Sequence, residues 1–299
     1  MSDALQAPGV ALRAEALIGL RRAALMKTLD IPLAALPGGF VTKRKGHGQD
    51  VADVREYVAG DDIRHLDRGT TARTGTLHVR RFQEERDRVS ILVADFRPSM
   101  LWGTRRAFRS VAAAEALALV GWRIVEEGGR VGLLALGAGE PVVVPARGRA
   151  RGMLDVIGGM IRAHDAALEL ALSGVRHDPD LATGLARLER ISPRGSEIIL
   201  ASGYDSLGEG FQDRIDELSE RRSLRCLRVV DQAAQSLPDG SYPIVLSDGT
   251  RTRATVRGAK SETVSDQIAG QPVLTIDAGQ SPEDTARLIA AAFPPDRGA

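Results

Sequence analysis

Residues 89–100 read VSILVADFRPSM, and this stretch indicates the fold. Its apolar part predicts a buried strand over 89–95, which ends in the carboxylate of Asp95. Residues 105–127 are rich in alanine and leucine and predict a long helix, which Gly128 and Gly129 end. A buried strand followed by a helix is the repeating unit of a parallel sheet with helices on its faces.

The rest of the chain continues this alternation. Further strands are predicted at 130–136, 141–145, 197–202, 224–231 and 273–277, and helices at 148–163, 180–191, 208–221, 261–269 and 282–293. We therefore predict an α/β domain over 88–299, with a doubly wound, mostly parallel sheet and helices on both faces. A β-hairpin insertion near 240–258 follows from the turn sequence SDGT at 247–250. An N-terminal segment over 1–87, with a helix at 10–29 and a hairpin at 76–82, is predicted to pack on this domain.

Composition indicates an ordinary globular protein of the cytoplasm. The chain has 299 residues, with 43% hydrophobic and 26% charged residues and a formal net charge of +1. This balance gives no general attraction to nucleic acid or to anionic membranes, and no apolar stretch is long enough for a membrane span. Cys226 is the single cysteine, which excludes an internal disulfide, and its apolar neighbours predict a buried thiol rather than a nucleophile.

The segment before the sheet carries a family motif. Residues 54–67 read VREYVAGDDIRHLD, and residues 71–75 and 80–86 read TARTG and RRFQEER. This order resembles that of the proteins called domain of unknown function 58, although Arg68 stands where that family usually has tryptophan. The resemblance implies a von Willebrand A-like fold and a partner role with a MoxR-type AAA+ ATPase. It also implies an adaptor that is not an enzyme and that acts in the maturation or remodelling of an unknown client protein.

The same resemblance implies three loops that in such folds hold a Mg²⁺ ion at a metal-ion-dependent adhesion site. Mg²⁺ prefers octahedral oxygen coordination. Here three of the five expected oxygen ligands are replaced, by Arg97, Pro179 and Gly203. The loops contain Asp95, Arg97 and Ser99; Pro179, Asp180 and Thr183; and Ser202, Gly203 and Asp205.

The fixed positive charge of Arg97 would repel a dication in the same small space. We therefore predict a degenerate site in which the Arg97 guanidinium pairs with Asp95, with Asp205 as a further partner, and no metal cofactor. The alternative is a Mg²⁺ ion held by Asp95, Ser99 and Asp205, or by ligands shifted to Thr183. Trp102, which follows the first loop, is a candidate for contact with a protein partner.

The charged residues of the family motif allow two interpretations. The favoured one is a structural ion-pair network, because charges this dense usually pair with one another. The alternative is a metal-dependent hydrolase that uses these carboxylates, and a scaffold without an ATPase partner is a further possibility. The residues of the predicted network are Arg55, Glu56, Asp61, Asp62, Arg64, Asp67, Arg73, Glu85 and Arg86.

Overall fold

A computed structural model describes residues 3–25, 50–58, 66–83, 88–235, 237–245, 250–257 and 265–292. The chain divides into two compact units, one of Met1–Phe40 with Val89–Ala299 and the other of Val41–Arg88. This division differs from the predicted one at residue 87, because it joins the N-terminal helix to the α/β domain.

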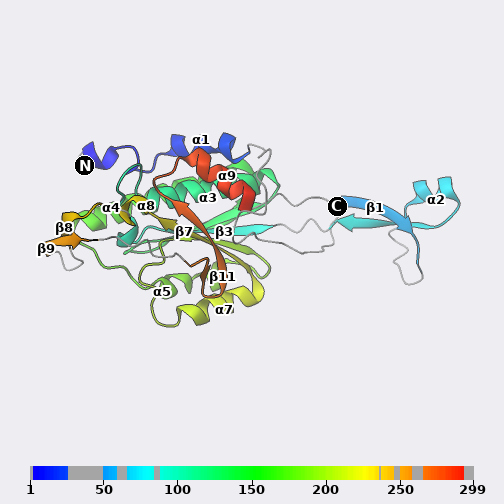
Figure 1. The fold of residues 1–299 in the computed structure, drawn as a ribbon. Coiled ribbons are helices and arrows are strands. Elements are labelled where there is room, and N and C mark those ends of the chain that lie inside the picture. The colour runs from blue at the N-terminus through cyan, green and yellow to red at the C-terminus, as the bar shows by residue number, and fades with distance from the viewer. Residues whose placement is uncertain are drawn as a thin grey trace. The chain divides into compact units, whose positions relative to one another are not determined.

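The larger unit is built on a seven-stranded sheet with the order β10-β11-β7-β6-β3-β4-β5 (Figure 1). The five strands from β11 to β4 are parallel, and the edge strands β5 and β10 are antiparallel to their neighbours. The predicted mostly parallel sheet is confirmed. The strands are β3 Val89–Asp95, β4 Arg130–Leu136, β5 Val142–Gly148, β6 Glu197–Ser202, β7 Ser223–Val230, β10 Gln267–Ile268 and β11 Gln271–Asp277.

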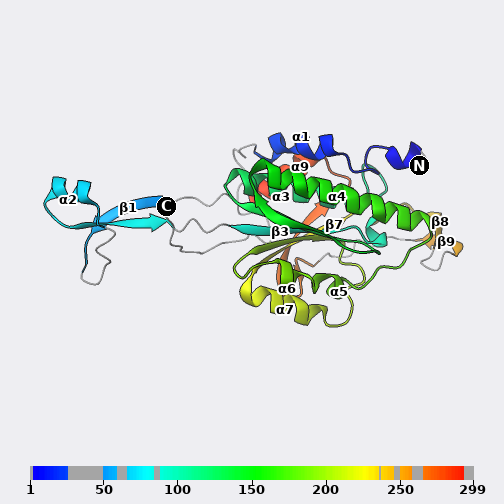
Figure 2. The same cartoon turned by 180° about the vertical axis from the view of Figure 1, so that it is seen from behind.

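Helices cover both faces of this sheet, as predicted (Figure 2). One face lies against α1 Ala14–Ala24, α3 Arg109–Glu126, α4 Arg149–Leu172 and α9 Pro282–Ala292. The other lies against α5 Leu181–Leu185, α6 Leu188–Ile191 and α7 Phe211–Arg221. In β3 the side chain of Leu92 packs into the first core, while Ile91 and Val93 pack into the second. Burial on both faces explains why this strand reads as a continuous apolar run.

Connections from β3 run in opposite directions across the sheet. The chain passes from β3 through α3 to β4 on one side, and β6 pairs with β3 on the other side. The carboxyl ends of β3 and β6 therefore meet where the strand order reverses, which is where open α/β sheets form their binding sites. Asp95 and Ser202 are the last residues of these two strands.

The smaller unit differs from the sequence-based prediction. Residues 76–82 do not form a hairpin, because β2 His78–Gln83 is a single strand that pairs antiparallel with β1 Asp50–Glu56. Between them lies α2 Arg68–Thr74, which was not predicted. Asp67 caps this helix by accepting a hydrogen bond from the Thr70 N–H at 2.7 Å, and Gly75 ends it with a φ of 77°. These two cap residues were available as signals in the sequence.

Three further expectations are changed in the larger unit. The predicted helix at 261–269 is wrong at its end, where β10 Gln267–Ile268 is a strand, and residues 261–264 lie outside the described residues. The helix predicted at 180–191 is two short helices, α5 and α6. The hairpin insertion corresponds to the antiparallel strands β8 Gly240–Val245 and β9 Arg251–Val256, whose turn residues 247–249 lie outside the described residues.

The remaining short elements are η1 Asp3–Gln6, η4 Pro98–Met100 and α8 Gln232–Gln235. Among the described residues, no helix combines the length and the apolar character needed to cross a bilayer.

A histidine lies inside the first core. His164 on α4 is 0% exposed; its Nε2 lies 3.0 Å from the Ser110 Oγ of α3, and its ring meets the edge of Phe96 with centroids 5.3 Å apart. Burial lowers the pKa of His164 to about 4, because a charged imidazole would lose its hydration there. The unfolded chain, in which the pKa is about 6.5, therefore binds a proton at higher pH than the folded chain.

This difference predicts a loss of stability in mild acid. The contribution of His164 is fully present above about pH 6.5 and decreases as the pH falls towards about 4. Between about pH 7.5 and about pH 5, the free energy of unfolding should fall by about 2 kcal/mol more in the wild-type protein than in His164→Gln. Urea unfolding at both pH values measures this, and equal pH dependence in the two proteins would contradict it.

Candidate functional site

The candidate site lies at the carboxyl ends of β3 and β6. Asp95 and Ser202 are both 0% exposed there. The Ser202 hydroxyl donates to Asp95 Oδ2 at 2.6 Å and accepts the Tyr204 N–H at 2.8 Å. Ser202 thus joins the first predicted loop to the third.

Arg97 fills the space between the loops and is 1% exposed. Its Nε and Nη2 donate to the two carboxylate oxygens of Asp95 at 2.9 and 2.8 Å. Its Nη1 donates to the carbonyl oxygens of Pro179 at 2.7 Å and Ser206 at 3.1 Å, and Nη2 donates also to the Asp205 carbonyl oxygen at 2.8 Å. A guanidinium has five N–H groups, and these five hydrogen bonds engage all of them.

The environment of Arg97 favours its charged form. Burial lowers the pKa of the guanidinium, but the hydrogen bonds to Asp95 and the negative charges of Asp95, Asp178 and Asp205 outweigh this, so its pKa is raised. A bidentate pair between arginine and carboxylate has fixed planar geometry as well as charge. Arg97 is therefore a permanent cation inside the loop cluster.

The third loop is strained where it meets Arg97. Tyr204 and Ser206 have φ angles of 60° and 46°, which residues other than glycine rarely adopt. Such a conformation costs about 1–3 kcal/mol for each residue. The carbonyl oxygens of Asp205 and Ser206, which lie in this turn, both accept hydrogen bonds from Arg97. These bonds offset the strain and fix the shape of the loop.

The carboxylate of Asp205 does not pair with Arg97, as the sequence suggested, but with Arg109. Arg109 Nη2 lies 2.7 Å from Asp205 Oδ2, and the same side chain donates to the Val229 and Ser99 carbonyl oxygens. A Cβ atom at Gly203 would lie 1.5 Å from Arg109 Nη2. Glycine at this position is thus required by the ion pair.

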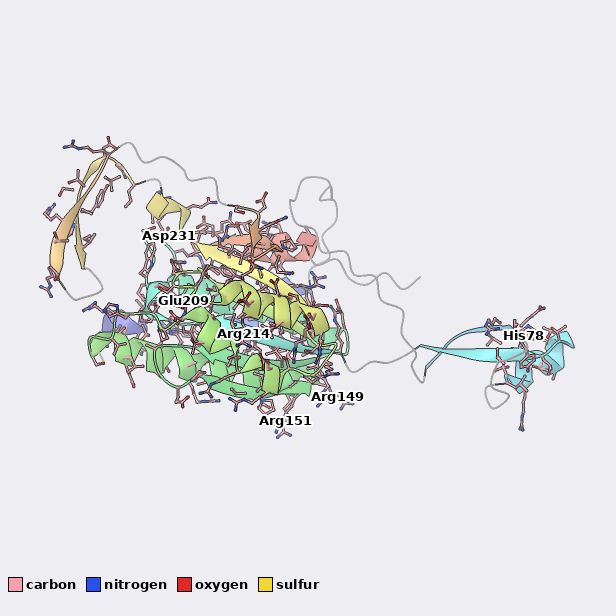
Figure 3. All side chains as sticks on the ribbon, turned by 90° about the horizontal axis from the view of Figure 1, so that it is seen from below. His78, Arg149, Arg151, Glu209, Arg214 and Asp231 are labelled. Atoms are coloured by element: carbon pink, nitrogen blue, oxygen red, sulfur yellow. The ribbon has the colours of Figure 1, made fainter. Side chains whose placement is uncertain are left out.

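Two acidic residues that sequence reasoning missed hold the first loop. Asp178 Oδ1 accepts the Ser99 N–H at 2.9 Å, and Asp178 Oδ2 lies 3.9 Å from Arg97 Nη1. Asp231, which is labelled in Figure 3, directly follows β7. It accepts hydrogen bonds from the Thr104 N–H at 2.6 Å and from the Thr104 hydroxyl at 2.7 Å. Asp178 precedes Pro179, so its place in the second loop was the available signal.

The remaining predicted residues lie at the rim of the site. Pro179 contributes its carbonyl oxygen to Arg97, while Asp180 and the α5 residue Thr183 are exposed. Trp102 is 40% exposed, and its ring lies over the Arg109 guanidinium at 5.7 Å. The indole therefore contacts Arg109 on one face, and part of its remaining surface is accessible to solvent.

The donor set does not fit a divalent metal ion. Both carboxylate oxygens of Asp95 already accept N–H groups from Arg97, and the Asp205 carboxylate is paired with Arg109. A dication bound here would have to displace a guanidinium that has five hydrogen bonds. Arg97 and Arg109 thus engage the Asp95 and Asp205 carboxylates from within the cluster. Among the described residues, the buried Ser99 Oγ and Asp178 Oδ2 have no hydrogen-bond partner.

Sequence comparison covers this site and both units. The family model described as "Protein of unknown function DUF58" matches residues 53–269, which is more than half of the chain. The chain belongs to the DUF58 family. Uncharacterized proteins of Mycobacterium bovis and Mycobacterium tuberculosis are each 29% identical to this DUF58 chain over 235 residues, which cover 76% of it and 70% of the relative.

The carboxylates of the DUF58 motif are described only in part. Asp67 caps α2, and Arg55 donates to the Glu56 carbonyl oxygen at 3.0 Å. Arg73 lies exposed in the last turn of α2. The predicted network members Asp61, Asp62, Arg64, Glu85 and Arg86 lie outside the described residues. The ion-pair network therefore stays a prediction.

We expect removal of the Arg97 side chain to destabilise the protein strongly. Arg97→Ala leaves the Asp95 carboxylate buried without its cation and removes the arginine donors from the Pro179 and Asp205 carbonyl oxygens, while the Ser206 carbonyl oxygen still accepts the Leu181 N–H at 3.0 Å. Breaking a buried pair in this way costs about 3–5 kcal/mol. Chemical denaturation measures the change, with Arg105→Ala, an exposed arginine of the same loop, as the control that should stay within about 0.5 kcal/mol of wild type. A loss for Arg97→Ala no larger than the control's would contradict this assignment.

Proposed function

We propose that this DUF58 chain is a protein-interaction module that is not an enzyme. In this proposal its larger unit is von Willebrand A-like and docks a MoxR-type AAA+ ATPase, which remodels or matures a client protein. The observation that carries the proposal is the state of Arg97, whose five N–H groups are all engaged within the cluster. The cluster therefore presents a shaped surface rather than an open coordination site.

The topology supports the von Willebrand A-like part of the proposal. In that fold the binding loops follow strands on either side of the point where the strand order reverses. Here the loops after β3 and β6, and the loop before α5, come together at that point. Function is argued from the site rather than from the fold, since one fold serves many functions.

The reactive side chains near the cluster support a role in binding. The Ser110 and His164 pair is 0% exposed, so a substrate has no access to it. Cys226 is buried, and burial raises the pKa of its thiol to about 11, which disfavours the nucleophilic thiolate. Asp95 accepts hydrogen bonds at both carboxylate oxygens and is not free to act as a base.

Two large hydrophobic side chains are exposed on the loops of the site. Trp102 is 40% exposed and Leu207, in the β6–α7 loop, is 36% exposed. Tryptophan is enriched among the residues that contribute most to protein–protein binding. Trp102 is also held in place by Arg109, so little conformational freedom is lost when a partner covers it.

Binding to the ATPase tests this proposal. Wild-type protein should bind the purified MoxR-type ATPase of the same organism, and Trp102→Ala should weaken that binding at least about tenfold, which corresponds to about 1.4 kcal/mol. Interferometry with immobilised ATPase measures both affinities. Leu154→Ala is the matched control, because Leu154 is 45% exposed on α4.

The alternatives give different results in the same assay. A scaffold without an ATPase partner would give no binding by the wild-type protein. Equal binding by wild type and Trp102→Ala would contradict the assigned surface. Hydrolysis of a test ester or phosphoester that depends on an added divalent metal would contradict the assignment as a protein that is not an enzyme.

A further inference from the structure

The strands β8 and β9 form a two-stranded sheet of their own. They pair antiparallel, with Pro243 opposite Arg253 and Tyr242 opposite Ala254, and neither pairs with another strand of the described residues. Such a pair has two free edges, and each edge offers unpaired N–H and C=O groups to another strand. Isolated two-stranded sheets are marginally stable, so a third strand would stabilise this one.

The edge of β8 is protected. Pro243 has no N–H group, and a proline within a ladder turns its missing donor towards the free edge. The Arg253 side chain crosses from β9 and donates to the Ser241 carbonyl oxygen at 2.8 Å and to its hydroxyl at 2.9 Å. An incoming strand would find one donor missing and one acceptor already bound.

The edge of β9 is open by the same geometry. Because Pro243 opposes Arg253, the alternation of the ladder turns the N–H and C=O groups of Arg251, Arg253 and Thr255 towards the free edge of β9. Residues 251–257 contain no proline. The Arg253 side chain extends towards β8, and no other strand of the described residues pairs with the β9 edge.

The side chains of β9 specify what this edge accepts. One side of the strand carries arginines at 251 and 253, and Arg257 continues the alternation; these three residues are exposed. The other side carries Ala254 and Val256, which are half-buried. Two β9 edges from two copies in antiparallel pairing would place arginines close to arginines, which is destabilising. The partner that complements this edge is an extended segment with acidic residues on one side and apolar residues on the other.

We propose that β9 is a docking strand for an extended acidic segment of a protein partner, which adds a third strand to the β8–β9 pair. Main-chain hydrogen bonds would give the affinity, and Arg251 and Arg257 would select acidic side chains, since the Arg253 guanidinium is bound to Ser241. This site is distinct from the surface around Trp102 and does not depend on the function proposed for that surface.

The proposal is tested with a short acetylated and amidated peptide that alternates glutamate with valine, bound to the full chain. Nuclear magnetic resonance should show slower hydrogen exchange at the N–H groups of Arg251, Arg253 and Thr255 when the peptide binds. The N–H of Ala254, which points into the existing ladder, should change little. A peptide that alternates lysine with valine should bind at least about tenfold more weakly, because its charges face arginines.

Two variants separate the edge from its charges. Thr255→Pro removes one edge donor without a change of charge, and Arg251→Glu with Arg257→Glu reverses the charge without loss of a donor; each should weaken peptide binding about tenfold. Arg151→Glu, at an exposed position of α4, is the control for a charge reversal elsewhere and should bind as wild type (Figure 3). Protection that is absent, that is equal with the lysine peptide, or that arises from self-association without peptide would overturn the proposal. Trp102→Ala should bind the peptide normally, so this proposal and the proposed function fail independently.

Discussion

The bidentate pair of Arg97 with Asp95 is the interaction on which the loops at the carboxyl edge of the sheet depend. The pair lies in a fully buried space where an isolated carboxylate would be very unfavourable. Arg97 also binds carbonyl oxygens of the second and third loops, so three segments far apart in the sequence are held by one side chain. The strained turn at Tyr204 and Ser206 persists because its carbonyl oxygens are bound in this way.

The sheet positions the loops that follow β3 and β6, and the residues around Arg97 fix the surface that these loops present. Reversal of strand order at β3 and β6 creates a site in many α/β proteins, where an ion or ligand is usually held by groups with free coordination positions. In this DUF58 protein the main charged groups are engaged from within: Arg97 has no unused donor, Asp95 is paired, and Asp205 is held by Arg109. What remains accessible is the rim, where Trp102 and Leu207 are exposed. This arrangement supports the proposed contact with a protein partner.

Local sequence patterns predicted the strands of the sheet and the Arg97–Asp95 pair. They did not predict the contacts between residues that lie far apart in the sequence. Strand β3 was predicted at its observed bounds because it is buried on both faces, and the pairing of Arg97 with Asp95 followed from the charge that replaced a ligand. The partner of the Asp205 carboxylate was assigned to Arg97, because no local pattern shows that Arg109 reaches it across 96 positions. The place of Asp178 next to Pro179 was a local signal, but its bond to the Ser99 N–H, 79 positions away, was not predictable, and the pairing of β1 with β2 is likewise non-local.

The most direct test of the account is calorimetric titration of the purified protein with Mg²⁺ and Mn²⁺. The account predicts no binding heat up to millimolar metal, because the Arg97 guanidinium occupies the place of the ion and both Asp95 oxygens are engaged. Arg97→Ser, which restores an oxygen ligand in the first loop, serves as the comparison for a cluster without the internal cation. Millimolar or tighter binding by the wild-type protein, abolished by Asp95→Ala, would contradict the claim that Arg97 takes the place of a metal.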